Sequence, residues 1–231
     1  MLAATPIRAA EQPTIVVEDW SSQPASKTGI PEGWTGHGWG SPKYDFTVVV
    51  EGPDKVLRLR SQGDNSTISK EVVVDIKRFP ILVWRWKVVR LPTSGDSRRR
   101  ETDDQAAQVY VTFPRFPEKL RSRIVGYVWD TTVPPGTIVK SPSAGAVTYV
   151  VARSGEADLG RWWTETRNVH DDYRRIYGEE PPETVKVVSV AIDSNDAGEE
   201  EFLRAADLEQ KYAEATPRGR PATAARRSPA R

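Results

Sequence analysis

Apolar and polar residues alternate through much of this chain, which is the pattern of half-buried β-strands. The clearest case is Ile81–Leu91, where Trp84 and Trp86 share one face with other apolar residues and Arg85 and Lys87 share the opposite face. Turn residues separate such runs at intervals of about 8–12 positions. The expected strands are Thr14–Trp20, Tyr44–Val50, Val56–Ser61, Thr67–Ile76, Ile81–Leu91, Ala106–Phe113, Ile124–Asp130, Val147–Arg153 and Val185–Ile192.

Two pairs of these strands are expected to be neighbours. Tyr44–Val50 and Val56–Ser61 are separated by Gly52-Pro53 and the residues that follow it, which predicts a β-hairpin. Ala106–Phe113 and Ile124–Asp130 flank a Pro-rich connection and form a second pair. With Ile81–Leu91, this second pair is expected to form the middle of one sheet.

Helical patterns are scarce. Trp162–Tyr177 has apolar residues near helical spacing, and Gly178 followed by Pro181-Pro182 predicts its end. Phe202–Tyr212 has helical propensity, but a closing strand fits this segment equally well.

The expected fold is therefore mainly β: one antiparallel β-sandwich of jelly-roll type with one or two short helices and extended arms at both ends. We place the sandwich at residues 14–212, an N-terminal arm at 1–13, and an Arg/Pro/Ala-rich tail at 213–231. The tail has almost nothing to bury, so it is expected to be disordered unless a partner holds it.

Composition supports a large core and excludes several kinds of site. The chain has 231 residues, of which 38% are hydrophobic and eight are Trp, enough to fill a sandwich interior. The net charge of +1 gives no overall field for nucleic acid, so no nucleic-acid partner is expected. The absence of Cys excludes disulfides and thiolate chemistry. No apolar run reaches the roughly 20 residues of a membrane span, and the N-terminus has no clear signal peptide.

Six segments occur along the chain in this order: WRWKV at Trp84–Val88, DDQAAQVYVTF at Asp103–Phe113, YVWD at Tyr127–Asp130, Ser154–Tyr173, GEEPP at Gly178–Pro182 and AIDSNDAG at Ala191–Gly198. Together they resemble a bacterial family known as domain of unknown function 3047. The resemblance covers roughly residues 16–212. It implies an exported protein, in the periplasm or another extracytoplasmic space, with a β-sandwich related in shape to galactose-binding or carbohydrate-binding jelly rolls. It implies no particular reaction.

Clustered acids suggest a structural cation and no other cofactor. Asp103 and Asp104 are adjacent, so one is expected to point inward and the other outward. With Asp193 and Asp196 from the Asx-rich segment Asp193–Gly198, they are candidate oxygen ligands for Ca²⁺. The alternative is that these acids pair with arginines, and that the Asx-rich segment is a simple turn. The arginines are Arg85, Arg98–Arg100 and Arg167.

The tryptophans offer a candidate ligand platform. Trp34 and Trp39 lie in a Gly-rich loop and Trp129 ends a strand, so their rings are candidates for stacking against a sugar or a partner. The alternative is that they are core residues, because Trp buries a large apolar area.

Catalysis has weaker support. Glu165 and Asp172 would share one face of a helix over Trp162–Tyr177, at a separation suited to a glycosidase pair. Arg167 beside them favours an ion-pair network, and the sequence contains no nucleophile motif. We therefore expect no catalytic residues and no enzyme.

Three functions remain. The first is a non-catalytic structural or docking subunit that holds a larger protein assembly through its arms and an exposed sandwich face. A membrane surface is one place where it could do so. Its basic contacts would be Arg218, Arg220, Arg226 and Arg227 of the tail, which has no acid to offset them. The alternative is a carbohydrate-binding module, and the second alternative is a glycoside-type hydrolase.

Overall fold

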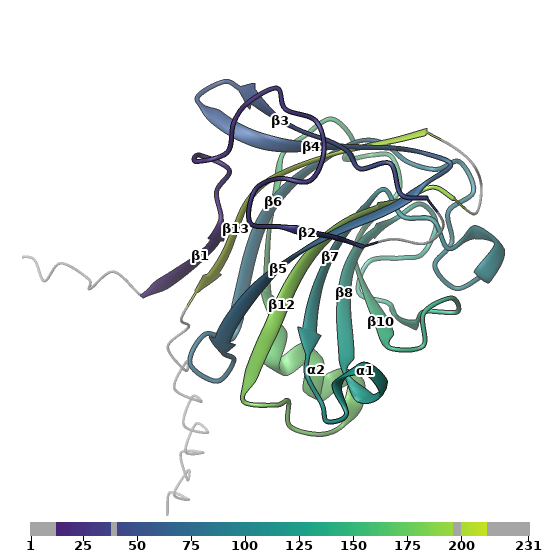
Figure 1. Ribbon diagram of the computed structural model, residues 1–231. Helices are drawn as coiled ribbons and strands as arrows, with labels where there is room; N and C mark the ends of the chain where they lie inside the picture. The colour runs from purple at the N-terminus through teal and green to yellow at the C-terminus, as the bar shows by residue number, and fades with distance from the viewer. Residues whose placement is uncertain (1–12, 38–40, 196–199, 212–231) are drawn as a thin grey trace, which may run out of the picture.

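The computed structural model describes residues 13–37, 41–195 and 200–211, and in it two β-sheets pack face to face (Figure 1). The first sheet has six strands in the order β11-β6-β13-β4-β3, and β1 also pairs with β13. The second has seven strands in the order β2-β5-β12-β7-β8-β10-β9. The expected β-sandwich is confirmed.

The strands of the first sheet come from both ends and the middle of the chain. They are β1 (Thr14–Glu18), β3 (Asp45–Glu51), β4 (Asp54–Gln62), β6 (Ile81–Arg90), β11 (Trp163–Asn168) and β13 (Glu200–Lys211). The second sheet consists of β2 (Thr35–His37), β5 (Asn65–Asp75), β7 (Ala107–Phe113), β8 (Arg123–Asp130), β9 (Ile138–Lys140), β10 (Val147–Ser154) and β12 (Thr184–Asp193). The helices of the described residues are α1 (Glu118–Arg121), α2 (Val169–Tyr177) and the 3₁₀ turn Arg100–Thr102.

Aromatic side chains fill the space between the sheets. The predicted alternation in β6 is confirmed, because Trp84 and Trp86 are buried and face the second sheet. The Trp84 ring lies 5.1 Å from that of Tyr127, and the Trp86 ring lies 6.0 Å from that of Trp129. These contacts join the sheets through large buried areas.

The expectation that β6 pairs beside β7 and β8 is wrong. The antiparallel pairing of β7 with β8 is confirmed, but β6 belongs to the first sheet and meets β8 across the core. The tryptophans of β6 showed that one face of this strand is buried, but they did not show which strands pair with β6.

A second departure is that β8 and β10 run parallel. The connection between them, residues 131–146, is long enough to return the chain before β10 begins, and β9 within it pairs antiparallel with β10.

The predicted helix over Trp162–Tyr177 is correct only in its second half, because the first half forms a strand. Residues 163–168 form β11 on the edge of β6, with Trp163 opposite Trp86. The helix begins only at Val169, where the Asn168 side chain accepts a hydrogen bond from the Asp171 amide. Gly178 ends it with a φ of 69°, as predicted.

The ambiguous segment at the C-terminal end is a strand, because β13 pairs with both β4 and β6. Residues 1–12 of the predicted N-terminal arm and the whole predicted tail, residues 213–231, lie outside the described residues. Within the described part of the chain, no helix is long and apolar enough to cross a membrane.

Candidate functional site

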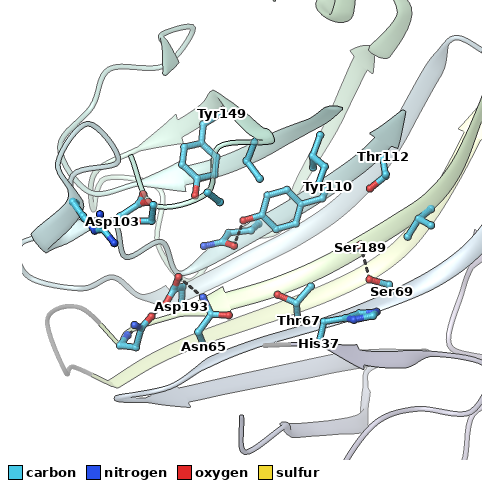
Figure 2. Close-up of a pocket in the computed structure, with 18 residues that line it drawn as sticks. His37, Asn65, Thr67, Ser69, Asp103, Tyr110, Thr112, Tyr149, Ser189 and Asp193 are labelled. Atoms are coloured by element: carbon cyan, nitrogen blue, oxygen red, sulfur yellow. Dashed lines mark hydrogen bonds between the residues drawn. The ribbon is translucent and has the colours of Figure 1, made fainter. Parts of the chain in front are cut away.

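A hollow of about 680 Å³ lies on the outward face of the second sheet (Figure 2). Side chains from β5, β12, β7, β8 and β10 form its floor, and the 3₁₀ turn and the Ser143–Ala144 loop add to its walls. The volume is within the range of small-ligand sites, about 300–1,000 Å³.

One row of residues crosses the floor from strand to strand. Ser69, Ser189 and Tyr110 lie opposite one another on β5, β12 and β7, and the row continues through Gly126 on β8 to Tyr149 on β10. The hydroxyls of Ser69 and Ser189 are 2.8 Å apart. Figure 2 shows Tyr110 in the middle of the hollow, with Tyr149 to one side and the serines to the other.

Gly126 leaves room for the two tyrosine rings. A Cβ atom at this position would lie 2.7 Å from the Tyr110 ring and 3.1 Å from the Tyr149 ring. The first distance is too short for carbon atoms in contact, so the rings could not keep these positions above a larger residue. The glycine therefore determines the shape of the floor.

A chain of hydrogen bonds holds the polar groups of the floor in place. The Tyr110 hydroxyl donates to the Gln108 side-chain oxygen, and the Gln108 amide donates to Gln105 Oε1 at 2.8 Å. The Gln105 amide donates to Asp103 Oδ1 at 2.8 Å, while the Ser141 hydroxyl donates to Asp103 Oδ2 at 3.3 Å. The chain fixes the orientation of two amide side chains, so the hollow presents its donors and acceptors in a set arrangement.

The character of the hollow changes along the strands. Toward the β7–β8 connection its lining is mostly apolar, with Ile124, Val147 and Val187. Toward the opposite end, Asn65 donates a hydrogen bond to Asp193, and Arg100 lies nearby in the lining. A ligand with both apolar faces and hydroxyl or amide groups would match this division.

Both tyrosines remain protonated at physiological pH. Burial, followed by the neighbouring Tyr149 phenol and the carboxylates of Asp193 and Asp103, raises the pKa of Tyr110 well above its ordinary value. Burial and then the Asp103 carboxylate also raise the pKa of Tyr149. The two phenols are therefore neutral groups able to donate and accept hydrogen bonds.

The tryptophan platform predicted from the sequence is contradicted at two of its three positions. Trp34 is buried, stacks on Trp20 at 5.4 Å and donates through its indole N–H to Glu18. Trp129 is also buried, and its indole N–H donates to the Gly155 carbonyl. Neither ring has the exposed face that stacking on a ligand requires. Trp39 lies outside the described residues.

The candidate acids lie in different surroundings from those expected. Asp103 and Asp104 are both buried, because they precede β7 instead of alternating within it. Asp130, the last residue of β8, accepts hydrogen bonds from the backbone amides of Ser97, Thr132 and Val133.

The structural cation remains a prediction. Among the described residues, no group of three or more His, Cys, Asp or Glu side chains is placed to hold a metal ion. Asp103 and Asp193 both line the hollow, Asp104 is buried outside its lining, and Asp196 lies outside the described residues.

Glu165 and Asp172 do not form the facing pair that a glycosidase needs. Glu165 lies on β11, where it pairs with Arg153 and accepts from the Trp86 indole at 3.1 Å. Asp172 lies on α2 and accepts from Arg167 at 2.8 Å and from the Tyr127 hydroxyl at 2.9 Å. Neither lines the hollow. The predicted ion-pair network is confirmed at Arg167.

The residues that line the hollow were missed from the sequence, apart from Asp103 and Asp193. The signal was present in β7, where Gln108, Tyr110 and Thr112 alternate with buried apolar residues. The docking subunit remains a prediction, because its tail residues Arg218, Arg220, Arg226 and Arg227 lie outside the described residues.

Comparison with known proteins gives one family and a group of weak structural likenesses. The model of a family described as protein of unknown function (DUF3047) matches residues 32–209. No curated protein matches the chain.

The solved structures that resemble the chain are low in sequence identity. A family 11 carbohydrate-binding module from Clostridium thermocellum is 8% identical with a TM-score of 0.49, and the match covers 90% of this chain and 99% of the module. A family 30 carbohydrate-binding module from the same organism is 11% identical with a TM-score of 0.43, covering 85% and 95%. A cellulase derived from Cel12A of Rhodothermus marinus is 13% identical with a TM-score of 0.42, covering 86% and 100%.

Proposed function

The chain belongs to the family described as protein of unknown function (DUF3047), and from that premise we propose that it binds a carbohydrate in the hollow of its second sheet, without cleaving it. The observation that carries the proposal is the row from Ser69 to Tyr149, which sets hydroxyls and two phenols around the space above Gly126.

The chemistry of the floor matches that of a sugar. A sugar ring has a rim of hydroxyls, each a donor and an acceptor, and apolar C–H faces. Tyr110 and the two serines supply hydroxyl groups on the floor, Gln108 holds the Tyr110 hydroxyl in place, and Ile124 and Val147 supply apolar contact at one end. Because the hydrogen-bond chain from Tyr110 to Asp103 already orients these groups, less ordering is required on binding.

Binding without cleavage fits the carboxylates of the hollow. Glycoside hydrolysis requires one carboxyl group that donates a proton and a second that acts as base or nucleophile. Asp103 accepts hydrogen bonds from Gln105 and Ser141, and Asp193 accepts one from Asn65. Both therefore act as acceptors that hold neighbouring side chains in place.

We expect Gln108→Ala to weaken carbohydrate binding about tenfold, because it removes a floor amide and interrupts the hydrogen-bond chain. The ligand is first identified by affinity electrophoresis of the wild type through soluble polysaccharides, and affinities are then measured by isothermal titration calorimetry. A reducing-sugar assay on the same polysaccharides tests for cleavage.

Gln62→Ala is the matched control, because Gln62 is an exposed glutamine on β4 of the other sheet. Equal affinities for the two variants would contradict the proposed site. Failure of the wild type to bind any neutral or acidic polysaccharide would contradict the proposed function, and release of reducing ends would contradict its non-catalytic character.

A further inference from the structure

The connection between β7 and β8 exposes two large apolar side chains. Phe116 is 88% exposed and Leu120 is 84% exposed, the highest values among the large hydrophobic residues described. Both belong to residues 114–123, which we call the hairpin tip and which contains α1 (Figure 1). The tip lies at the end of the β7–β8 pair, outside the residues that line the hollow.

The hairpin tip is held in a defined shape. The amides of Leu120 and Arg121 both donate to the Pro117 carbonyl at 3.0 Å, and the Ser122 amide donates to the Glu118 carbonyl at 3.2 Å. These bonds close one helical turn, which carries Leu120, and Phe116 lies just before its N-cap Pro117. The sandwich core is already filled by other residues, so the exposure of these two side chains is a feature of the folded chain.

Ion pairs fasten the base of the tip to the sandwich. Arg115 and Arg123 both pair with Glu179, which follows α2, and both donate to the Tyr173 hydroxyl, at 3.3 and 3.2 Å. Glu118 pairs with Lys186 on β12 at 2.6 Å. The tip is thereby attached on two sides.

The hairpin tip is also strongly basic. Residues 114–123 contain four basic side chains and one acidic one, a net charge of +3. Including the two partners just named, Glu179 and Lys186, leaves this charge unchanged. Glu180, the next acid along the chain, pairs with Arg174 at 2.9 Å. The segment that carries the apolar pair therefore has an excess of positive charge.

We propose that the hairpin tip binds the surface of an anionic lipid bilayer, with Phe116 and Leu120 entering the interface and the basic side chains contacting the headgroups. An apolar element flanked by Lys and Arg is the combination that holds peripheral proteins on anionic membranes. An acidic protein surface would match the charge, but an exposed pair on a projecting turn offers it little area to bury. A sugar would match neither the charge nor the aliphatic Leu120.

The test is sedimentation of the full chain with vesicles of phosphatidylcholine containing about one-third phosphatidylglycerol, compared with pure phosphatidylcholine. We expect the wild type to prefer the anionic vesicles and to dissociate as salt is raised. The double variant Phe116→Ala/Leu120→Ala is expected to partition at least tenfold less, because two apolar groups are removed from the interface. Arg121→Gln is expected to lower partitioning about fivefold.

Matched controls separate the tip from general surface effects. Val73→Ala removes another exposed apolar side chain, 78% exposed on β5, and Lys27→Gln removes an exposed charge elsewhere; both are expected to bind as the wild type does. Thermal unfolding confirms that each variant is folded. Because the basic C-terminal tail is intact in every protein, a tip variant that binds like the wild type would overturn the proposal.

Two further outcomes would also overturn the proposal. The first is equal binding of the wild type to both kinds of vesicle, or to neither. The second is a tip variant that loses affinity for a carbohydrate but keeps its affinity for vesicles, which would assign the tip to the hollow. The vesicle measurements by themselves do not bear on carbohydrate binding at the hollow, so the two proposals fail independently.

Discussion

Replacing Glu18 by alanine is expected to lower the free energy of unfolding by about 3 kcal/mol, because it leaves several buried groups without their acceptor. Glu18 accepts hydrogen bonds from the Trp20 amide at 3.0 Å, the Trp34 indole at 3.0 Å and the Lys70 ammonium at 2.9 Å. The carboxylate thus connects β1, the Trp34 loop and β5. We expect the lower end of the range of free-energy losses that follow from breaking a buried ion pair, because the Lys70 side chain is 28% exposed.

The effect of Glu18 should depend on pH. Burial acts to raise its pKa, but the hydrogen bonds from Lys70, Trp34 and the Trp20 amide outweigh burial and lower the pKa below its ordinary value of 4.5. A group whose pKa is lower in the folded state stabilises the fold at pH values above its unfolded-state pKa. It loses that contribution as the pH falls through its folded-state pKa. The difference in stability between wild type and Glu18→Ala should therefore shrink below about pH 4.5.

Urea unfolding followed by tryptophan fluorescence measures both effects. Asp19→Ala is the matched control, because Asp19 is the neighbouring acid, is exposed and accepts local hydrogen bonds from Ser21. We expect it to change stability by less than about 1 kcal/mol. Two results would contradict the predicted role of Glu18. One is an equal loss of unfolding free energy in Glu18→Ala and Asp19→Ala, and the other is a loss in Glu18→Ala that is the same at neutral and acid pH.

Replacing Gly126 by valine is expected to weaken carbohydrate binding at least a hundredfold, on the order of 3 kcal/mol. The first added carbon would lie 2.7 Å from the Tyr110 ring, so the ring must move into the hollow, and valine occupies part of the floor as well. A moved Tyr110 also loses its hydrogen bond to Gln108. Stability should fall less than binding, because the hollow gives the displaced ring room. This prediction rests on the proposed function.

The control for Gly126 is Gly145→Val, in the loop that contributes Ser143 and Ala144 to the same hollow. A Cβ atom at Gly145 would meet nothing within 4 Å, so we expect little change in affinity. Gly126→Ala should have an intermediate effect. Calorimetric titration with the polysaccharide that the wild type binds ranks the three variants. If Gly126→Val binds as tightly as Gly145→Val while remaining folded, the floor is not the binding surface.

Some elements could be predicted because their causes are local. The β3–β4 hairpin follows from alternation on either side of a turn at Gly52, which has a φ of 63°. The end of α2 follows from Gly178 and the prolines after it. Alternation also assigned Trp84 and Trp86 to the core, because one face of a strand must be buried in a sandwich of this size.

The start of α2 could not be predicted in this way. Trp163–Asn168 has residues suited to either conformation, and pairing with β6 decided in favour of a strand. Propensity within so short a segment is weaker than the backbone hydrogen bonds that a neighbouring strand offers. The same is true of β13, which lies between β4 and β6.

The sequence by itself determined that this protein is a β-sandwich with a tryptophan-rich core, because period-two alternation and turn residues are local properties of the chain. Only the tertiary structure decided where a ligand could bind. Ser69, Ser189 and Tyr149 are far apart in the chain, and strand order alone brings them into one row with Tyr110 and Gly126. Alternation shows which residues share a face, but not which strands adjoin or whether a ring faces the core or solvent. For that reason Trp34 and Trp129 were candidates for a ligand platform and the two tyrosines were overlooked.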